Sequence, residues 1–228
     1  MDIAVKRWVG YGGLVFFVLV VAATFVAPNQ PNTNATVAKV VSSYHQNRGA
    51  YFASAYIIVV AIIVGLTYFW YLREYLAQVP ANRRLLTVAF AGAILFAMSG
   101  AVSAGFNFAL ADGSNKSHLT GSSMQALNLL NNDFGLPMVA AGAATFLLLT
   151  GLVIVRNGGL PVWLGWVAIV FGVISVTGFV GPAGIGLWVL LTSITVIVLG
   201  RRTQSTSAPA STARPDDAVS AERQAPLR

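Results

Sequence analysis

Long apolar segments alternate with shorter polar ones along most of the chain. Each apolar segment holds about 20 residues, the length with which an α-helix crosses a hydrocarbon core of roughly 30 Å. The segments do not show the alternating pattern of a transmembrane β-strand. We therefore predict an all-α fold, a polytopic membrane helix bundle whose six transmembrane helices cover residues 8–27, 50–72, 85–110, 137–155, 161–180 and 183–200.

The basic residues lie mostly at the ends of these apolar segments. The chain of 228 residues is 56% apolar and 9% charged, whereas soluble domains average about 25% charged residues. Its net charge of +7 therefore indicates the Lys and Arg excess on the cytoplasmic side of a membrane protein, and we expect no nucleic-acid partner. An N-in/C-in orientation places Lys6, Arg7, Arg73, Arg83, Arg84, Arg156, Arg201 and Arg202 inside, against Lys39, Arg48 and Lys116 outside.

Two outer loops, residues 28–49 and 111–136, carry helix signals of their own. In the first, a turn-rich segment precedes residues 36–47, which can form a helix. In the second, Ser122 and Gln125 have the spacing of a capping box. Helical spacing there separates an apolar face of Met124, Leu127, Leu130 and Phe134 from a polar face of Gln125, Asn128 and Asn132. We therefore expect two short outer-side helices, the second of them amphipathic.

After the last apolar segment the composition changes. Residues 201–228 are rich in Ser, Ala, Pro and mixed charges, and they have no periodic apolar face. Such composition is typical of disordered segments, because too little apolar surface can be buried. We therefore predict a six-span membrane domain at 1–200 and a disordered cytoplasmic tail at 201–228.

Four segments resemble a known group of proteins. They are "SYHQNRG" at 43–49, "WYLREYL" at 70–76, "SSMQALNLLNNDFG" at 122–135 and "LPVWLGWVAIVFGV" at 160–173. In order and spacing the chain resembles small bacterial multi-pass membrane proteins of unknown function, of the DUF4386 type. The resemblance implies a multi-pass protein of the bacterial inner, or plasma, membrane, and it implies no catalytic residue.

A candidate polar cap lies on the predicted outer side. Its residues are Tyr44, His45, Arg48, Tyr51, Asp112, His118, Asn128, Asn132 and Asp133. One hypothesis is a pocket under the two outer helices, with Arg48 paired to Asp133 and a histidine facing a ligand or a proton. The other is an interfacial helix end with Tyr anchors, a snorkelling Arg48 and a solvated His45.

A polar stripe on the third predicted span is the second candidate. Ser99, Ser103 and Asn107 recur at intervals of four and therefore share one helix face. A substrate path would use such a stripe, since polar groups in a bilayer face water or partners. Helix packing would use it too, and the neighbouring Gly100 and Ala104 favour packing.

Several kinds of chemistry are not indicated. The chain has no cysteine, its two histidines lie in predicted loops, and no ionisable residue lies in the middle of a span. We expect no metal, no cofactor and no catalytic motif, and a coupled transporter is disfavoured. The leading hypothesis is a non-enzymatic accessory or ligand-binding protein that acts through the outer polar cap. Its expected partners are membrane lipid, another membrane protein or a second copy of itself.

Two alternatives stay open. One is a small uncoupled transporter or channel with a path along the third span. The other is an enzyme that uses His45 as a base.

Overall fold

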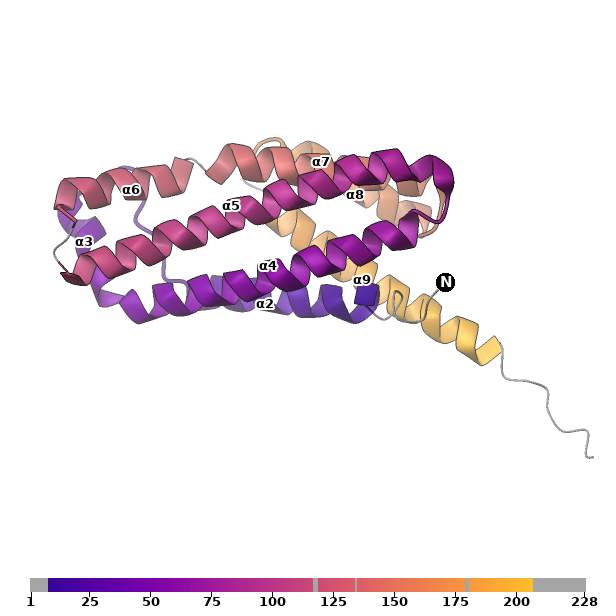
Figure 1. The fold of residues 1–228 in the computed structure, drawn as a ribbon, viewed down its shortest axis with the longest axis horizontal. Helices are drawn as coiled ribbons and strands as arrows, with labels where there is room; N and C mark the ends of the chain where they lie inside the picture. Colours follow the sequence, from indigo (N-terminus) through magenta and orange to yellow (C-terminus); the bar gives the residue numbers. More distant parts are fainter. Residues whose placement is uncertain (1–7, 117–118, 134, 179–180, 207–228) are drawn as a thin grey trace, which may run out of the picture. The chain divides into compact units, whose positions relative to one another are not determined.

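The computed structural model describes residues 8–116, 119–133, 135–178 and 181–206. The chain divides into two compact units, Met1–Ile197 and Val198–Arg228, and the bundle described below belongs to the first. The described residues form helices and no strand (Figure 1). The elements are η1 (Trp8–Gly12), α2 (Gly13–Val26), α3 (Val37–Gln46), α4 (Arg48–Leu76), η2 (Pro80–Asn82), α5 (Arg83–Lys116), α6 (Gly121–Asp133), α7 (Gly135–Asn157), α8 (Val162–Ser175) and α9 (Gly181–Thr206).

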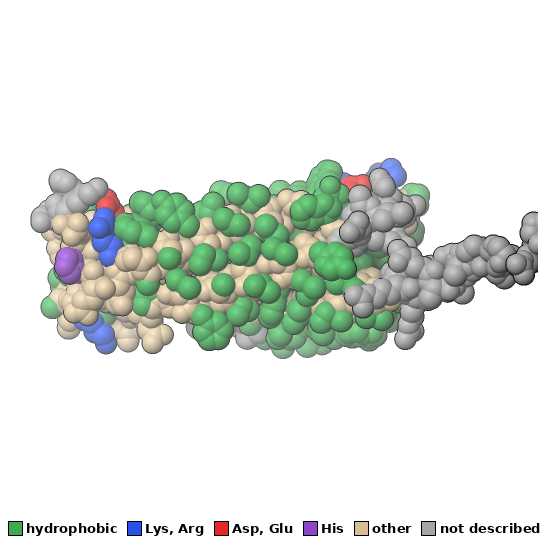
Figure 2. Space-filling model, turned by 90° about the horizontal axis from the view of Figure 1, so that it is seen from below, with side chains coloured by type: hydrophobic (Ala, Val, Ile, Leu, Met, Phe, Trp, Pro, Cys, Tyr) green, Lys and Arg blue, Asp and Glu red, His purple; other side chains and the backbone are tan. Residues whose placement is uncertain are grey.

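Among the residues that the structure describes, five helical stretches are long and apolar enough to cross a membrane. They are Trp8–Val26, Arg48–Leu76, Pro80–Asn115, Gly121–Asn157 and Gly181–Leu199. Apolar side chains cover the visible side of the bundle, and charged side chains gather toward its ends (Figure 2). These features indicate a multi-pass membrane protein and confirm the predicted helix bundle in its broad form.

The fifth predicted span is shorter than expected. Its helix, α8, has 14 residues, which corresponds to about 21 Å at 1.5 Å per residue. The apolar run continues past Ser175, but Gly178 has a φ of 81°. This left-handed backbone ends the helix, because residues with a side chain rarely adopt it.

Neighbouring helices in the sequence pack side by side. Helix α2 packs on α4, α4 on α5, α5 on α7 and α7 on α8. Helix α9 returns to the bundle through two hydrogen bonds. Trp188 Nε1 donates to the Leu164 carbonyl at 3.0 Å, and Ser193 Oγ donates to the Val9 carbonyl at 3.3 Å.

Glycines permit the closest of these helix contacts. A Cβ atom added to Gly142 would lie 2.5 Å from the backbone nitrogen of Phe96, and one on Gly92 would lie 2.8 Å from that of Phe146. A Cβ on Gly151 would lie 2.6 Å from the Gly165 carbonyl. Small residues of this kind let helices approach closely in a membrane, where lipid removes most of the hydrophobic driving force.

The two short helices α3 and α6 lie together at one end of the bundle (Figure 1). With the loop 27–36 and the adjoining ends of α4 and α5 they form what we call the cap. Helix α3 joins α2 to α4, and α6 joins α5 to α7. Each short helix therefore connects two long helices in the same order along the chain. The structure thus confirms the two predicted short helices. The capping box is wrong, because Thr120 Oγ1 accepts from the Ser123 amide, while the Gln125 side chain bonds elsewhere.

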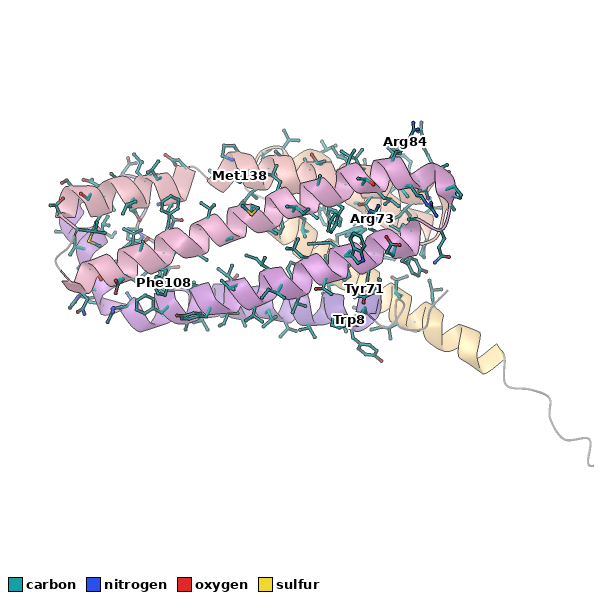
Figure 3. All side chains as sticks on the ribbon, in the orientation of Figure 1. Trp8, Tyr71, Arg73, Arg84, Phe108 and Met138 are labelled. Carbon is teal, nitrogen blue, oxygen red and sulfur yellow. The ribbon has the colours of Figure 1, made fainter. Side chains whose placement is uncertain are left out.

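The opposite end of the bundle carries aromatic and basic side chains (Figure 3). Trp8 stacks on Tyr71 with 5.8 Å between ring centroids. The Arg73 guanidinium lies 5.1 Å from the ring centroid of Trp70, and Arg84 lies at the same end. Such a mixture is typical of the interface between a membrane and water.

The predicted tail at 201–228 falls mostly outside the described residues. Helix α9 runs to Thr206, past the position at which the sequence predicts the tail to begin. Residues 207–228 lie outside the described ranges.

Candidate functional site

The cap is held together by side-chain amides of α6. Asn128 is buried and accepts a hydrogen bond from the Tyr44 hydroxyl at 3.2 Å. Its amide nitrogen donates to the carbonyls of Pro31 at 3.2 Å and Asn32 at 3.4 Å. Gln125 Nε2 donates to the Ala35 carbonyl at 3.1 Å. These amides give the irregular loop 27–36 the hydrogen-bond partners that a buried backbone requires.

Helix α6 is rotated relative to the sequence prediction. Its buried face carries Met124, Asn128 and Asn131, whereas Leu129 and Leu130 are 44% and 48% exposed. The predicted separation of Met124 and Asn128 onto opposite faces is therefore wrong, because both side chains are buried. The amides of α6 face inward, because they supply hydrogen bonds that the loop and α5 need.

The tyrosines of the cap form its small core. Tyr44 and Tyr51 are both buried and stack with 4.4 Å between ring centroids. Burial raises the pKa of the Tyr44 phenol above its ordinary value, and the neighbouring Tyr51 raises that pKa further. The Tyr44 hydroxyl therefore stays protonated at neutral pH and remains the donor to Asn128.

The charged residues of the cap are arranged differently from the prediction. Arg48 Nη2 lies 3.2 Å from Asp112 Oδ1, and the two side chains are 36% and 35% exposed. The predicted pairing of Arg48 with Asp133 is replaced by this ion pair, and Asp133 is exposed. His45 is exposed on α3, and His118 lies outside the described residues. The described part of the chain contains no group of three His, Cys, Asp or Glu that could hold a metal.

A second amide network joins α6 to the predicted stripe on α5. Asn131 Nδ2 donates to Asn107 Oδ1 at 2.9 Å, and Ser103 Oγ donates to Asn131 Oδ1 at 3.1 Å. Gln30 Nε2, from the loop, also donates to Asn107 Oδ1 at 3.0 Å. Ser99, one turn further on, donates to the Phe96 carbonyl within its own helix. The stripe therefore packs α5 against the cap.

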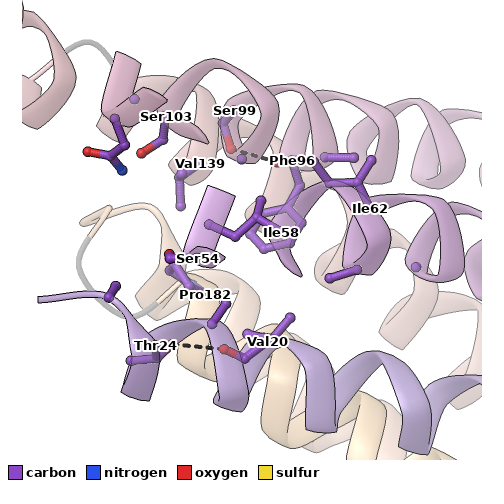
Figure 4. Close-up of a pocket in the computed structure, with 18 of the residues that line it drawn as sticks. Val20, Thr24, Ser54, Ile58, Ile62, Phe96, Ser99, Ser103, Val139 and Pro182 are labelled. Carbon is purple, nitrogen blue, oxygen red and sulfur yellow. Dashed lines mark hydrogen bonds between the residues drawn. The ribbon is translucent and has the colours of Figure 1, made fainter. Parts of the chain in front are cut away.

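A cavity of about 540 Å³ lies directly beneath this network. Ser99, Ser103 and Asn107 form part of one wall, and Val20 and Thr24 of α2 lie across from it (Figure 4). Its polar end is lined by Gln30, Ser103, Asn107, Asn131 and Asn132, and most of the remaining lining is apolar. On α4 the lining runs from Ser54 to Phe69, about 22 Å along the helix.

Aromatic rings close the cavity at the end away from the cap. Phe16 and Phe69 both line the cavity, and their ring centroids lie 5.7 Å apart. Phe146 lies behind Phe69 at 4.7 Å, and Trp188 follows at 5.6 Å from Phe146. On the far side of Phe69 there is a void of about 10 Å³, which holds at most a single water molecule.

The side of the cavity between α2 and α7 is open. Among the described helices, substantial packing joins α2 to α4 and α5 to α7, but not α2 to α7. Helix α9 begins at Gly181, and its second residue, Pro182, lines the cavity on this side. The lining residues Thr24, Leu136 and Pro182 are exposed and form the rim of the opening.

Sequence reasoning missed three residues of this site. Asn131 is the centre of the second network, and it follows Asn128 at the i, i+3 spacing that shares a helix face. Gln30 and Ser54 also line the cavity. Gln30 lies between two prolines in a loop, where no periodic pattern indicates the direction of a side chain.

Comparison with known proteins finds no matching family model, no matching curated protein and no matching solved structure. The resemblance to DUF4386-type proteins therefore stays a prediction, and the function is argued from the cavity and its cap.

Proposed function

We propose that this chain is a protein of the bacterial plasma membrane that binds a lipid-like amphipathic ligand in the cavity beneath the cap. It is proposed to act as a binding or accessory protein and not as an enzyme. The observation that carries the proposal is the division of the cavity lining into a polar end and a long apolar wall. Its volume of about 540 Å³ lies within the range of small-molecule sites, roughly 300–1,000 Å³.

The opening between α2 and α7 supports entry from the membrane. In an aqueous protein an exposed apolar rim would favour aggregation, but in a bilayer it is covered by lipid chains. The rim residues Leu136 and Pro182 are apolar, and Asn29 and Gln30 lie at the polar end of the lining. A lipid can therefore enter sideways with its chain in the apolar part and its headgroup at the amides.

The proposed topology has six spans and both termini inside, with α8 as the shortest span. The basic and aromatic side chains at the end opposite the cap support this orientation. With the cap outside, the polar end of the cavity lies in the outer leaflet, at the depth where headgroups meet acyl chains.

An uncoupled transporter is the second candidate, favoured by the stripe Ser99, Ser103 and Asn107 along the cavity wall. Transport requires a path to both sides. The aromatic layer of Phe16, Phe69 and Phe146 blocks the cavity at one end, so this candidate needs a second conformation. A closed-ended binding site requires none.

The test fills the cavity and measures the co-purifying ligand. Ala97 is buried on the cavity wall, and Ala101, one turn away, is exposed. We expect native mass spectrometry to find a lipid of defined stoichiometry on the wild type and on Ala101→Phe, and none on Ala97→Phe. A ligand that persists on Ala97→Phe, or a bare wild type, contradicts the proposal. A second protein of fixed stoichiometry instead supports the accessory role.

A further inference from the structure

The lining of the cavity contains no ionisable side chain among the described residues. Residues 134, 179 and 180, which are near lining residues in sequence but outside the described ranges, are Phe, Phe and Val. Arg48, the closest cation to the lining along α4, is paired with Asp112 and does not line the cavity. A charged headgroup would lose its hydration here without gaining a counter-charge, which disfavours its binding.

The hydrogen-bonding capacity at the polar end is defined by the second amide network. Asn107 Oδ1 already accepts from Gln30 and from Asn131. Asn107 Nδ2 donates to no described residue, and Gln30 Oε1 accepts from none. Both residues line the cavity. The site therefore offers amide N–H donors beside one carbonyl acceptor, an arrangement that a hydroxyl or a carbonyl oxygen complements.

From these two observations we propose that the ligand is an uncharged lipid whose hydroxyl or carbonyl headgroup binds Asn107 and Gln30. The inference rests on the proposed function and specifies its ligand class. The acyl chain lies along the apolar wall between Ser54 and Phe69, and the headgroup lies at the amides. Phospholipids are disfavoured, because the described lining offers no counter-charge to the phosphate, although their acyl chains suit the same apolar wall.

The experiment compares two probes that differ by one phosphate. Monoacylglycerol and lysophosphatidic acid, each with the same diazirine-bearing acyl chain, are added to the full chain in zwitterionic lipid vesicles at neutral pH. After illumination, crosslinks are assigned by mass spectrometry to residues 54–69 and 96–107. We expect the uncharged probe to label these segments at least ~10-fold more strongly, because the phosphate stays in water. Ala97→Phe should abolish that labelling, and Ala101→Phe should leave it unchanged.

Substitutions at Gln30 test whether the preference for the uncharged probe over lysophosphatidic acid can be reversed. Gln30 is exposed and lies in a loop, so substitutions there should leave the fold intact. Gln30→Lys supplies the missing positive charge, and we expect labelling by lysophosphatidic acid to rise ~10-fold through a charge-assisted hydrogen bond. Gln30→Leu removes one polar partner of the headgroup, and we expect labelling by monoacylglycerol to fall about fivefold.

Each outcome has a distinct meaning. Equal or stronger labelling by lysophosphatidic acid in the wild type overturns the uncharged headgroup, while the cavity function stands if Ala97→Phe still abolishes labelling. Labelling by neither probe, or labelling that Ala97→Phe does not change, overturns the proposed function as well. Unchanged preference in Gln30→Lys overturns the assignment of the headgroup to Gln30.

Discussion

The cap and the opposite half of the bundle hold their helices together by different means. In the opposite half, Gly92, Gly142 and Gly151 bring helix backbones into direct contact. In the cap, Asn128 and Asn131 bridge wider gaps with side-chain amides. Direct backbone contact leaves little free volume, whereas the amides span a wider gap and leave hydrogen-bonding groups along the cavity. The cavity lies where the two kinds of packing meet, and this explains its apolar wall and its polar end.

The largest effect is expected where the glycine contact is lost. Gly142→Val would drive its Cβ into the α5 backbone, 2.5 Å from Phe96 N. Because backbone cannot yield as a side chain does, we expect a loss of at least about 3 kcal/mol, the upper end for overpacked cores. The measurement is the thermal midpoint of the detergent-solubilised protein.

The same substitution at Gly105 is the matched control. A Cβ there meets nothing within 4 Å, so Gly105→Val should shift the midpoint little. If both variants are equally stable, α5 and α7 do not pack through Gly142. That result would contradict the claim that glycine contacts hold the half of the bundle opposite the cap.

The next largest effect is expected in the cap. Asn128→Leu keeps the branched heavy-atom shape of the side chain but leaves the Tyr44 hydroxyl without its acceptor and the Pro31 and Asn32 carbonyls without this donor. We expect a cost of about 2–4 kcal/mol, together with faster hydrogen exchange in residues 37–46. The control is the same substitution at the exposed residue Asn115. Asn115→Leu should leave the hydrogen exchange of residues 37–46 unchanged. Unaltered exchange in Asn128→Leu would mean that the amide network does not hold α3.

The helices were more predictable from the sequence than their rotations. Apolar length locates most spans, because a membrane imposes that length on any helix that crosses it. The rotation of α6 was not predictable, because the periodicity of α6 does not show which distant groups need hydrogen bonds. Asn128 and Asn131 turn inward to bond the loop carbonyls and Asn107, and Leu129 and Leu130 are left exposed. The partner of Arg48 depends on that rotation, so Asp133 was expected where Asp112 is found.

The candidate site was predictable only in part. The four-residue spacing of Ser99, Ser103 and Asn107 indicated one face of α5, and that face does line the cavity. The packing interpretation of the stripe is confirmed, since Ser103 and Asn107 bond across to Asn131 of α6. A substrate path along the same residues stays a prediction. The cavity itself was not predictable, because its lining combines residues from helices that are far apart in the sequence, such as α2 and the start of α9 at Pro182. No local sequence pattern shows which distant helices lie beside each other.

The smallest effect is expected at the ion pair of the cap. Arg48 and Asp112 are about one-third exposed, so water screens the pair and its coupling energy should stay below about 1 kcal/mol. Arg48 also lies over the Phe52 ring at 4.9 Å, a contact that Asp112→Asn retains. A double-mutant cycle of Asp112→Asn with Arg48→Gln, measured at low and high salt, isolates the pair, and Asp133→Asn is the control. A coupling well above 2 kcal/mol that salt does not weaken would mean that the pair is shielded from water in the membrane, by lipid or by a second chain over the cap. The cap would then differ from the opposite half in a second way, because an ion pair would stabilise it in addition to the side-chain amides.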